Sequence, residues 1–322
     1  MSALLADIGG THARFGLLVG GAVALIDSRP VGDYGSAIDA VRSFIQQHAA
    51  GERVAHAVLA AAGPVKDGRA KMTNARWVLD ADELKRACGF DSAVIVNDLE
   101  ALAWAVPRLG AGDVAWIGGG NAVPTKPVAL VAPGTGLGMA CYLPGSDGPR
   151  VLSSEGGHAT LPASDESEAA IIAALRREYG HVSAERALSG SGLVNLYKAV
   201  AGQGMEKGDV PPAEVTRLAL EGDPVARKAL DAFCDFLGSV AGNTALTFEA
   251  RGGVLVGGGV VGNFLDHLKS SRFRQRFESK GRFQPYLSAV PTGVIVRDDP
   301  AFLGLQVLAE GLMQLAAAKA PP

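Results

Sequence analysis

Cysteine is scarce in this chain, and long apolar runs and blocks of basic residues are absent from its sequence. The three cysteines, Cys88, Cys141 and Cys234, are odd in number and far apart, which indicates neither a disulfide framework nor a clustered zinc site and suits a reducing compartment. No stretch approaches the roughly 20 apolar residues of a membrane-spanning helix. Lysine and arginine total 30 against 33 aspartates and glutamates, a net charge of −3, so nucleic acid is not an expected partner.

The first residues also lack the features of a targeting segment. No basic residue precedes the short apolar run, and that run meets a carboxylate at Asp7, which is typical neither of a signal peptide nor of a membrane anchor. We therefore expect a cytoplasmic protein that binds no membrane.

Glycine, in contrast, is abundant: 42 of 322 residues, about 13% against a typical proportion of roughly 7%. The glycines follow no Gly-X-Y period, and leucine, isoleucine and valine are plentiful, so neither collagen nor a disordered chain is expected. A chain of this length that is 48% hydrophobic buries a large core, as one large or two moderate domains. The composition predicts a globular protein whose backbone makes many special turns.

Strand and helix patterns alternate along the chain, and their order restarts after the loop Gly118–Gly120. The first half predicts strands at 3–8, 13–19, 22–27, 54–61 and 93–96 and helices at 36–48, 80–88 and 98–106. The second half predicts strands at 127–132, 137–143, 254–256 and 294–296, with helices at 166–178, 190–200, 213–248 (broken near Gly222), 263–268 and 302–319. Each half opens with a strand, a glycine turn and a second strand. We predict two related α/β domains with a cleft between them and a boundary near 107–112.

Two glycine turns could each hold a phosphate. In Asp7-Ile8-Gly9-Gly10-Thr11 the glycines let backbone N–H groups approach an anion, Thr11 can donate, and Asp7 can orient Mg²⁺ through water. In Gly134-Thr135-Gly136 a strand follows the turn, where a Rossmann fingerprint requires a helix. Either turn alone could be a plain hairpin. Two such turns facing each other across a cleft would form a phosphate clamp.

The segment Val96-Asn97-Asp98-Leu99-Glu100 lies where a buried strand should meet a helix. One interpretation is an N-cap, in which Asn97 accepts from the helix amides and Glu100 closes a capping box. The other makes Asp98 a general base for a hydroxyl nucleophile, because a carboxylate shielded from water has a raised pKa, with Asn97 bonded to the same substrate. The two roles are compatible.

Three polar side chains, Glu155, His158 and Glu185, could hydrogen-bond the vicinal hydroxyls of a sugar. They could also ligate a metal, since mixed glutamate and histidine sets do so. The structural alternatives are a surface ion pair of Glu185 with Arg186 and a buried imidazole bonded to backbone. Further on, Gly257–Gly259 follow an expected strand, and a flat purine could lie over their open backbone; a plain packing turn is the alternative.

Together these motifs resemble those of the bacterial glucokinases of the actin-like ATPase superfamily. The matching segments occur in the family's order from residue 5 to about 305, and the ordered set is specific although no single motif is decisive. They are Leu5-Ala6-Asp7-Ile8-Gly9-Gly10-Thr11, Asn97–Ala101, Ala132–Gly138, Ser154–His158, Glu185–Gly190 and Gly252–Gly259. The resemblance implies two actin-like (ribonuclease H-like) α/β domains with an interdomain cleft. The small domain would comprise 1–109 plus 299–322, and the large domain 110–298.

The resemblance also implies ATP-dependent transfer of phosphate to the 6-hydroxyl of glucose, with Asp98 as the catalytic base and Mg²⁺ as the counter-ion of ATP. Glucose would be bound by Asn97, Asp98, Glu155, His158 and Glu185. ATP would be bound by Ala6, Asp7, Ile8, Gly9, Gly10, Thr11, Gly134, Thr135, Gly136, Gly257, Gly258 and Gly259, with Asp7 holding the metal through water. Members of the family are commonly homodimers.

Some positions depart from the family pattern. His12 stands where asparagine is usual, Ser191 where proline is common, and Gly262-Asn263 where Pro-Arg is usual, which bears on nucleotide affinity and the base pocket. The zinc-binding cysteine cluster of the related ROK sugar kinases is missing from the sequence. Two other functions are considered: a sugar sensor of the same fold, against which the intact Asp98 argues, and a metal hydrolase using Glu155, His158 and Glu185.

Overall fold

The computed structural model describes residues 2–49, 51–72, 76–202 and 210–319. The chain divides into two compact units: unit 1, Met1–Leu109 with Asp298–Pro322, and unit 2, Gly110–Arg297. Residues 1 and 320–322, at the ends of the expected small domain, lie outside the described residues.

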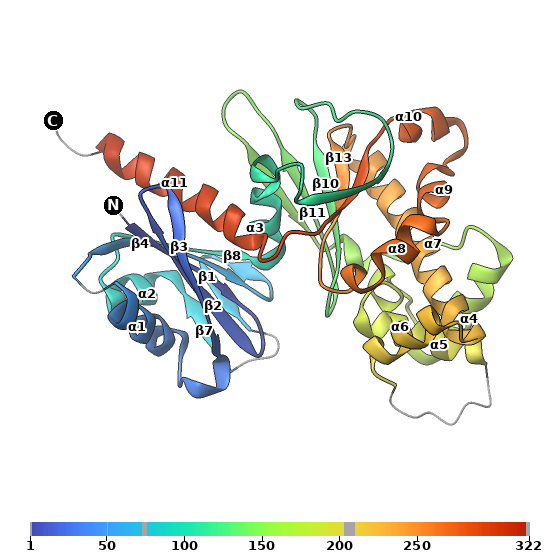
Figure 1. The fold of residues 1–322 in the computed structure, drawn as a ribbon, viewed down its shortest axis with the longest axis horizontal. Helices are drawn as coiled ribbons and strands as arrows, with labels where there is room; N and C mark the ends of the chain where they lie inside the picture. The colour runs from blue at the N-terminus through green and yellow to red at the C-terminus, as the bar shows by residue number, and fades with distance from the viewer. Residues whose placement is uncertain (1, 50, 73–75, 203–209, 320–322) are drawn as a thin grey trace. The chain divides into compact units, whose positions relative to one another are not determined.

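Unit 1 is built on a five-stranded sheet of order β3-β2-β1-β4-β8 (Figure 1). Its first three strands form an antiparallel meander, and β4 and β8 run parallel to β1. The strands are β1 (Ser2–Ile8), β2 (His12–Val19), β3 (Ala22–Pro30), β4 (Val54–Ala61) and β8 (Ser92–Asn97). A small sheet joins β5 (Val65–Lys66), β6 (Arg69–Lys71) and β7 (Val78–Asp80). The helices are α1 (Ala37–His48), α2 (Ala81–Cys88), α3 (Asp98–Trp104) and α11 (Ala301–Lys319), with 3₁₀ turns η1 (Val31–Asp33) and η2 (Val106–Arg108).

The strand β1 is buried on both faces, so its alternate residues supply two different cores. Leu4 and Ile8 pack with α1 and α2 on one face, whereas Ala3 and Leu5 pack with α3 and α11 on the other. This double burial explains why the sequence of β1 is an almost unbroken apolar run. Packing on both faces also holds in place the end of the strand, where Asp7 lies.

Contrary to the expectation that no stretch approaches the length of a membrane-spanning helix, α11 is, among the described residues, long and apolar enough by length and composition alone to cross a membrane. Its N-terminal half contributes Phe302 and Leu305 to the core of unit 1, and the helix packs against α3, β1 and β4. The apolar character of this part is therefore explained by packing against the sheet.

Unit 2 contains a six-stranded sheet of order β12-β11-β10-β13-β14-β9. The strands are β9 (Val114–Gly118), β10 (Val128–Pro133), β11 (Leu137–Leu143), β12 (Arg150–Ser154), β13 (Gly253–Val256) and β14 (Thr292–Ile295). The helices are α4 (Glu166–Tyr179), α5 (Gly190–Ala201), α6 (Pro212–Glu221), α7 (Pro224–Phe248), α8 (Leu265–Ser270), α9 (Phe273–Glu278) and α10 (Gln284–Ser288). Four 3₁₀ turns complete the described part of unit 2: η3 (Gly156–His158), η4 (Ala184–Arg186), η5 (Val261–Phe264) and η6 (Gly281–Phe283).

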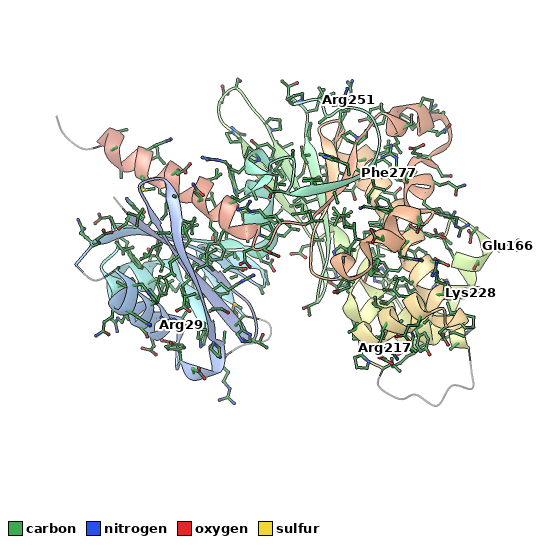
Figure 2. All side chains as sticks on the ribbon, viewed as in Figure 1. Arg29, Glu166, Arg217, Lys228, Arg251 and Phe277 are labelled. Carbon is green, nitrogen blue, oxygen red and sulfur yellow. The ribbon has the colours of Figure 1, made fainter. Side chains whose placement is uncertain are left out.

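The helix α7 is the central helix of unit 2, and it packs against β10 and β13 as well as α5, α6 and α9. Phe233 and Phe236 on α7 are fully buried in this core, and so is Phe277 of α9 (Figure 2). The core supports β10 and β13 from one side, which positions the turns that follow these two strands.

Several expected elements differ from the structure at their ends. The expected helix 98–106 ends at Trp104 and continues as the 3₁₀ turn η2, which contains Pro107. The expected helix 263–268 is divided into η5 and α8. The predicted break in 213–248 is confirmed, with Gly222 in the left-handed region and Asp223 capping α7. The strands β5, β6, β7, β9 and β12 and the short helices α9 and α10 were not expected.

Candidate functional site

The first glycine turn joins β1 to β2, and Gly9 N–H donates to the carbonyl of His12 at 2.9 Å. Asp7 and Arg14 face each other across the two strands, and the Arg14 guanidinium pairs with both Asp7 and Asp299. Burial raises the pKa of Asp7, and the positive charge of Arg14 opposes that rise. The turn therefore carries a buried carboxylate whose orientation is restrained by a cation.

His12 is the first residue of β2, directly after this turn, and its ring Nδ1 is 3.2 Å from the hydroxyl of Thr11. The sequence predicts that the Thr11 hydroxyl donates a hydrogen bond to a phosphate. The histidine that replaces the family's usual asparagine at position 12 therefore contacts the predicted phosphate turn directly.

The segment around Asn97 forms the N-terminus of α3, as the N-cap interpretation predicts. Asn97 Oδ1 accepts from Leu99 N–H at 2.9 Å, and its Nδ2 donates to the carbonyl of Gly63 at 2.9 Å. Both polar atoms of the amide are thus bonded within the protein, which fixes the direction in which α3 starts.

Asp98 is the first residue of α3, and its Oδ1 accepts from Leu99 N–H at 2.8 Å. The residue is solvent-exposed. Desolvation by the surrounding protein raises the pKa of Asp98, and the negative charge of Asp7 adds to the rise.

The second glycine turn and the glycines after β13 lie side by side in unit 2. Because β10 and β13 are parallel neighbours, the turns at their carboxyl ends meet at one edge of the sheet. Gly257 N–H donates to the carbonyl of Val131 at 3.0 Å. A Cβ on Gly258, where φ is +83°, would lie 2.3 Å from the carbonyl oxygen of Pro133. The structure therefore brings two of the three predicted nucleotide segments together.

The structure also brings Glu155, His158 and Glu185 together in unit 2. His158 Nε2 is 3.8 Å from Glu155 Oε2, and His158 Nδ1 is 3.8 Å from Glu185 Oε1. The side chains of Glu155 and His158 are 84% and 60% exposed, whereas that of Glu185 is 32% exposed. The two carboxylates can accept hydrogen bonds from the hydroxyls of a polyhydroxylated ligand, and the imidazole between them can donate one from a ring N–H. Within the described part of the chain, no group of three or more His, Cys, Asp or Glu has a geometry that could hold a metal ion.

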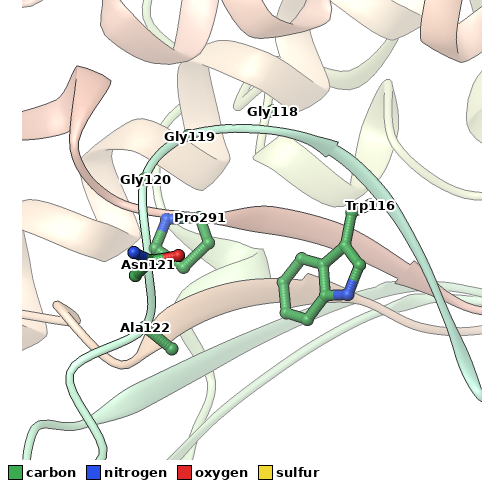
Figure 3. A pocket seen from close by; sticks show the side chains of 7 residues that line it. All are labelled: Trp116, Gly118, Gly119, Gly120, Asn121, Ala122 and Pro291. Atoms are coloured by element: carbon green, nitrogen blue, oxygen red, sulfur yellow. The ribbon is translucent and has the colours of Figure 1, made fainter. Parts of the chain in front are cut away.

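A cavity of about 270 Å³ lies elsewhere in unit 2, and no predicted site residue lines it (Figure 3). Its lining consists of Trp116, Gly118, Gly119, Gly120, Asn121, Ala122 and Pro291. Gly119 has a φ of +100°, and a Cβ there would lie 2.2 Å from the carbonyl oxygen of Val290. The close approach of two backbone segments therefore explains why glycine is needed in the loop Gly118–Gly120.

Two charged residues beside the first glycine turn were missed by the sequence reasoning. Arg14 could have been found from the hairpin, because it is the cross-strand partner of Asp7. Asp299 gave no local signal, since it lies 285 residues from Arg14 in the sequence.

Each of the two α/β units has a sheet in which a glycine turn joins an antiparallel strand pair. The fold is that of the actin-like sugar kinases, as the similar solved structures indicate. A glucokinase from an Antarctic psychrotroph aligns with a TM-score of 0.89 at 35% identity, covering 96% of this chain and 99% of that one. A ROK family glucokinase from Streptomyces griseus, solved in complex with glucose and AMPPNP, shares the fold with a TM-score of 0.64 at 23% identity, covering 97% of this chain and 100% of that one.

The chain belongs to the glucokinase family, whose family model, Glucokinase, matches residues 4–312. The glucokinase of Nitrobacter hamburgensis is 42% identical over 304 residues, covering 94% of this chain and 95% of that protein. The Bifunctional protein glk of Paraburkholderia xenovorans is 41% identical over 313 residues, covering 96% of this chain. The chain spans about half, 49%, of the length of that bifunctional relative.

Proposed function

We propose that this protein is a glucokinase that transfers the γ-phosphoryl group of ATP to the 6-hydroxyl of glucose. The observation that carries the proposal is the 42% identity to the Nitrobacter hamburgensis glucokinase along 95% of that protein. The accessible cluster of Glu155, His158 and Glu185 supports a polyhydroxylated substrate.

Asp98 is proposed as the general base. Its solvent-exposed carboxylate starts α3, and its raised pKa makes it a better proton acceptor than an ordinary aspartate. A base in this position takes the proton of the 6-hydroxyl as that oxygen attacks the γ-phosphorus, with ADP leaving on the opposite side. Asn97, Asp98, Glu155, His158 and Glu185 are proposed to bind the sugar hydroxyls, with Asn97 held rigidly by its two hydrogen bonds.

The nucleotide is proposed to bind through backbone N–H groups of the two glycine turns, Gly9–Thr11 and Gly134–Gly136, with its adenosine over Gly257–Gly259. The donor set beside the first turn fits Mg²⁺, which prefers oxygen ligands and keeps several of its waters. Arg14 donates to Asp7 Oδ2, and Asp7 Oδ1 would orient a metal-bound water. When bound, Mg²⁺ neutralises charge on the transferred phosphoryl group.

The decisive variant is Asp98→Asn, which keeps the shape of the side chain and removes the base. We expect turnover to fall by about 10²–10⁴-fold, the usual contribution of a general base, while glucose still binds. The measurements are glucose- and ATP-dependent release of ADP, and glucose affinity by calorimetry. Asp91→Asn is the matched control, because Asp91 is an exposed aspartate of unit 1 whose carboxylate pairs with Arg53.

Near-normal turnover of Asp98→Asn would remove Asp98 from the base role. Tight glucose binding by the unaltered protein with no turnover at all would instead support the sugar-sensor alternative. A panel of hexoses with ATP, with and without Mg²⁺, tests the substrate and the metal in the same assay.

We also propose a homodimer in the cytoplasm, on the resemblance to the family. Light scattering of the purified protein measures its oligomeric state, and a monomer at micromolar concentration would contradict the proposal.

A further inference from the structure

Two hydrogen bonds connect the second glycine turn, Gly134–Gly136, to the segment that carries Glu185. Leu137 N–H, the first amide after the turn, donates to Glu185 Oε2 at 2.9 Å. Gly190 N–H donates to the carbonyl of Gly134, the first residue of the turn, at 2.9 Å. Both ends of the turn are therefore held by one short segment, residues 185–190.

That segment is itself rigid, because a fully buried serine fixes it. Ser189 caps α5 by accepting from Gly192 N–H, and its hydroxyl donates to the carbonyl of Glu185, both at 2.9 Å. Gly190 is the first residue of α5, and its amide is one of those that have no partner inside a helix. The helix uses this amide to hold the turn.

Glu185 connects the turn to the predicted sugar site through its two carboxylate oxygens. Oε2 accepts from Leu137 N–H, while Oε1 lies 3.8 Å from His158 Nδ1. A Cβ on Gly136 would lie 2.5 Å from Oε2, so glycine at this position allows the carboxylate to reach the turn. One side chain thus contacts both the phosphate turn and the sugar-binding cluster.

We propose that Glu185 and the first amide of α5 are positioning groups that couple sugar binding to nucleotide binding through the turn Gly134–Gly136. The inference rests on the proposed function and adds to it a route for the coupling. A sugar hydroxyl bonded to Oε1 restrains the carboxylate, and the carboxylate then restrains the amide of Leu137 beside the nucleotide phosphates. The coupling is reciprocal, so the nucleotide tightens sugar binding by the same factor.

The test compares Gly190→Pro with Gly190→Ala. Proline is favourable at the first helical position, and Ser189 already has the extended conformation that proline requires of its predecessor. Both variants add a Cβ, whose nearest neighbour at 3.6 Å is an ordinary contact. Only proline replaces the N–H that holds Gly134 by a ring Cδ, which breaks this hydrogen bond and pushes the Gly134 carbonyl away. Glu166→Pro is the control for proline at a first helical position, because it starts α4 of the same unit after an extended Asp165.

The readout is the affinity for Mg²⁺ with AMPPNP, measured by calorimetry with and without saturating glucose. In the unaltered protein we expect glucose to tighten nucleotide binding by roughly fivefold or more, within the usual range of coupling between sites. In Gly190→Pro the coupling factor should fall towards one, with glucose affinity in the absence of nucleotide preserved. Gly190→Ala should keep more of the coupling, and Glu166→Pro all of it.

Equal coupling factors in Gly190→Pro and Gly190→Ala would overturn the inference, as would loss of coupling in Glu166→Pro. If Gly190→Pro does not fold, Ser189→Ala provides the same test, because it removes the hydroxyl that holds Glu185 and should lower the coupling factor. The proposed function fails separately, if the unaltered protein does not phosphorylate glucose.

Discussion

Gly157 lies at the centre of the predicted sugar-binding cluster, and the substitution Gly157→Ala should disrupt that cluster. A Cβ at this position would lie 2.0 Å from the carbonyl oxygen of Leu137 and 3.0 Å from its carbonyl carbon. Ordinary contacts of a Cβ start at about 3.4 Å, so one of the two segments must move by more than 1 Å. Leu137 begins β11 and pairs with Pro133 of β10. We therefore expect η3, which carries His158, to move away.

The size of both effects follows from that displacement. Overpacking of this kind costs about 1–3 kcal/mol, and each kcal/mol lowers Tm by about 2–4 °C in a domain of 150–250 residues. A displacement near 1 Å can reduce turnover by about 10²-fold. We expect a lower Tm of unit 2 and a kcat/KM for glucose reduced by about that factor.

Scanning calorimetry measures Tm, and initial rates across glucose concentrations at saturating ATP measure kcat/KM. Gly156→Ala is the comparison, because its Cβ meets the flexible end of Met139 at 2.8 Å and the thioether can rotate away, so both losses should be smaller. If Gly157→Ala keeps the Tm and the kcat/KM of the unaltered protein, the reasoning from close approach is wrong.

Three further predictions concern other parts of the chain. Gly258→Ala should weaken AMPPNP binding by about 10-fold or more, since the new Cβ requires both a positive φ and a 2.3 Å approach to Pro133; unchanged affinity in calorimetry would contradict this. A general base acts when it is deprotonated, and the pKa of Asp98 is raised above its ordinary value of 3.8. We therefore expect kcat/KM to increase with pH, with the midpoint of the increase above pH 3.8. A midpoint at or below that pH would refute the assignment of Asp98 as the base. Gly304→Ala should destabilise unit 1 by about 1–3 kcal/mol, because a Cβ would lie 1.8 Å from the carbonyl of Ala101; denaturant unfolding measures it, and an unchanged midpoint argues against it.

The sequence predicted the elements whose own residues carry a strong pattern. β1 and β4 are fully buried runs, and the break before α7 has both a glycine and a capping aspartate. The edge strands β9 and β12 escaped prediction because a strand at the edge of a sheet needs no regular alternation. Trp116 on β9 and Leu152 on β12 are 52% and 46% exposed. Such strands are defined by hydrogen bonds to neighbours that lie far away in the sequence.

The candidate site shows the same division. Gly9, Gly134 and Asn97 belong to local turns and caps, whose chemistry can be read within five or six residues. The pairing of Arg14 with Asp299 and the bond from Leu137 to Glu185 depend on how distant segments return to one another. A single sequence contains no local signal for either contact.

Unit 1 is formed by two separate stretches of chain, so the ribosome makes the whole of unit 2 before unit 1 is complete. A ribosome releases β1 and β4 long before it makes α11, which follows the whole of unit 2 in the sequence. Until Phe302 and Leu305 emerge, the sheet face formed by Ala3 and Leu5 has no cover from α11, and exposed apolar strands are prone to aggregate. Unit 2, being continuous, can complete its core first. The N-terminal sheet therefore stays exposed on this face throughout the synthesis of unit 2, when a chaperone would protect it from aggregation.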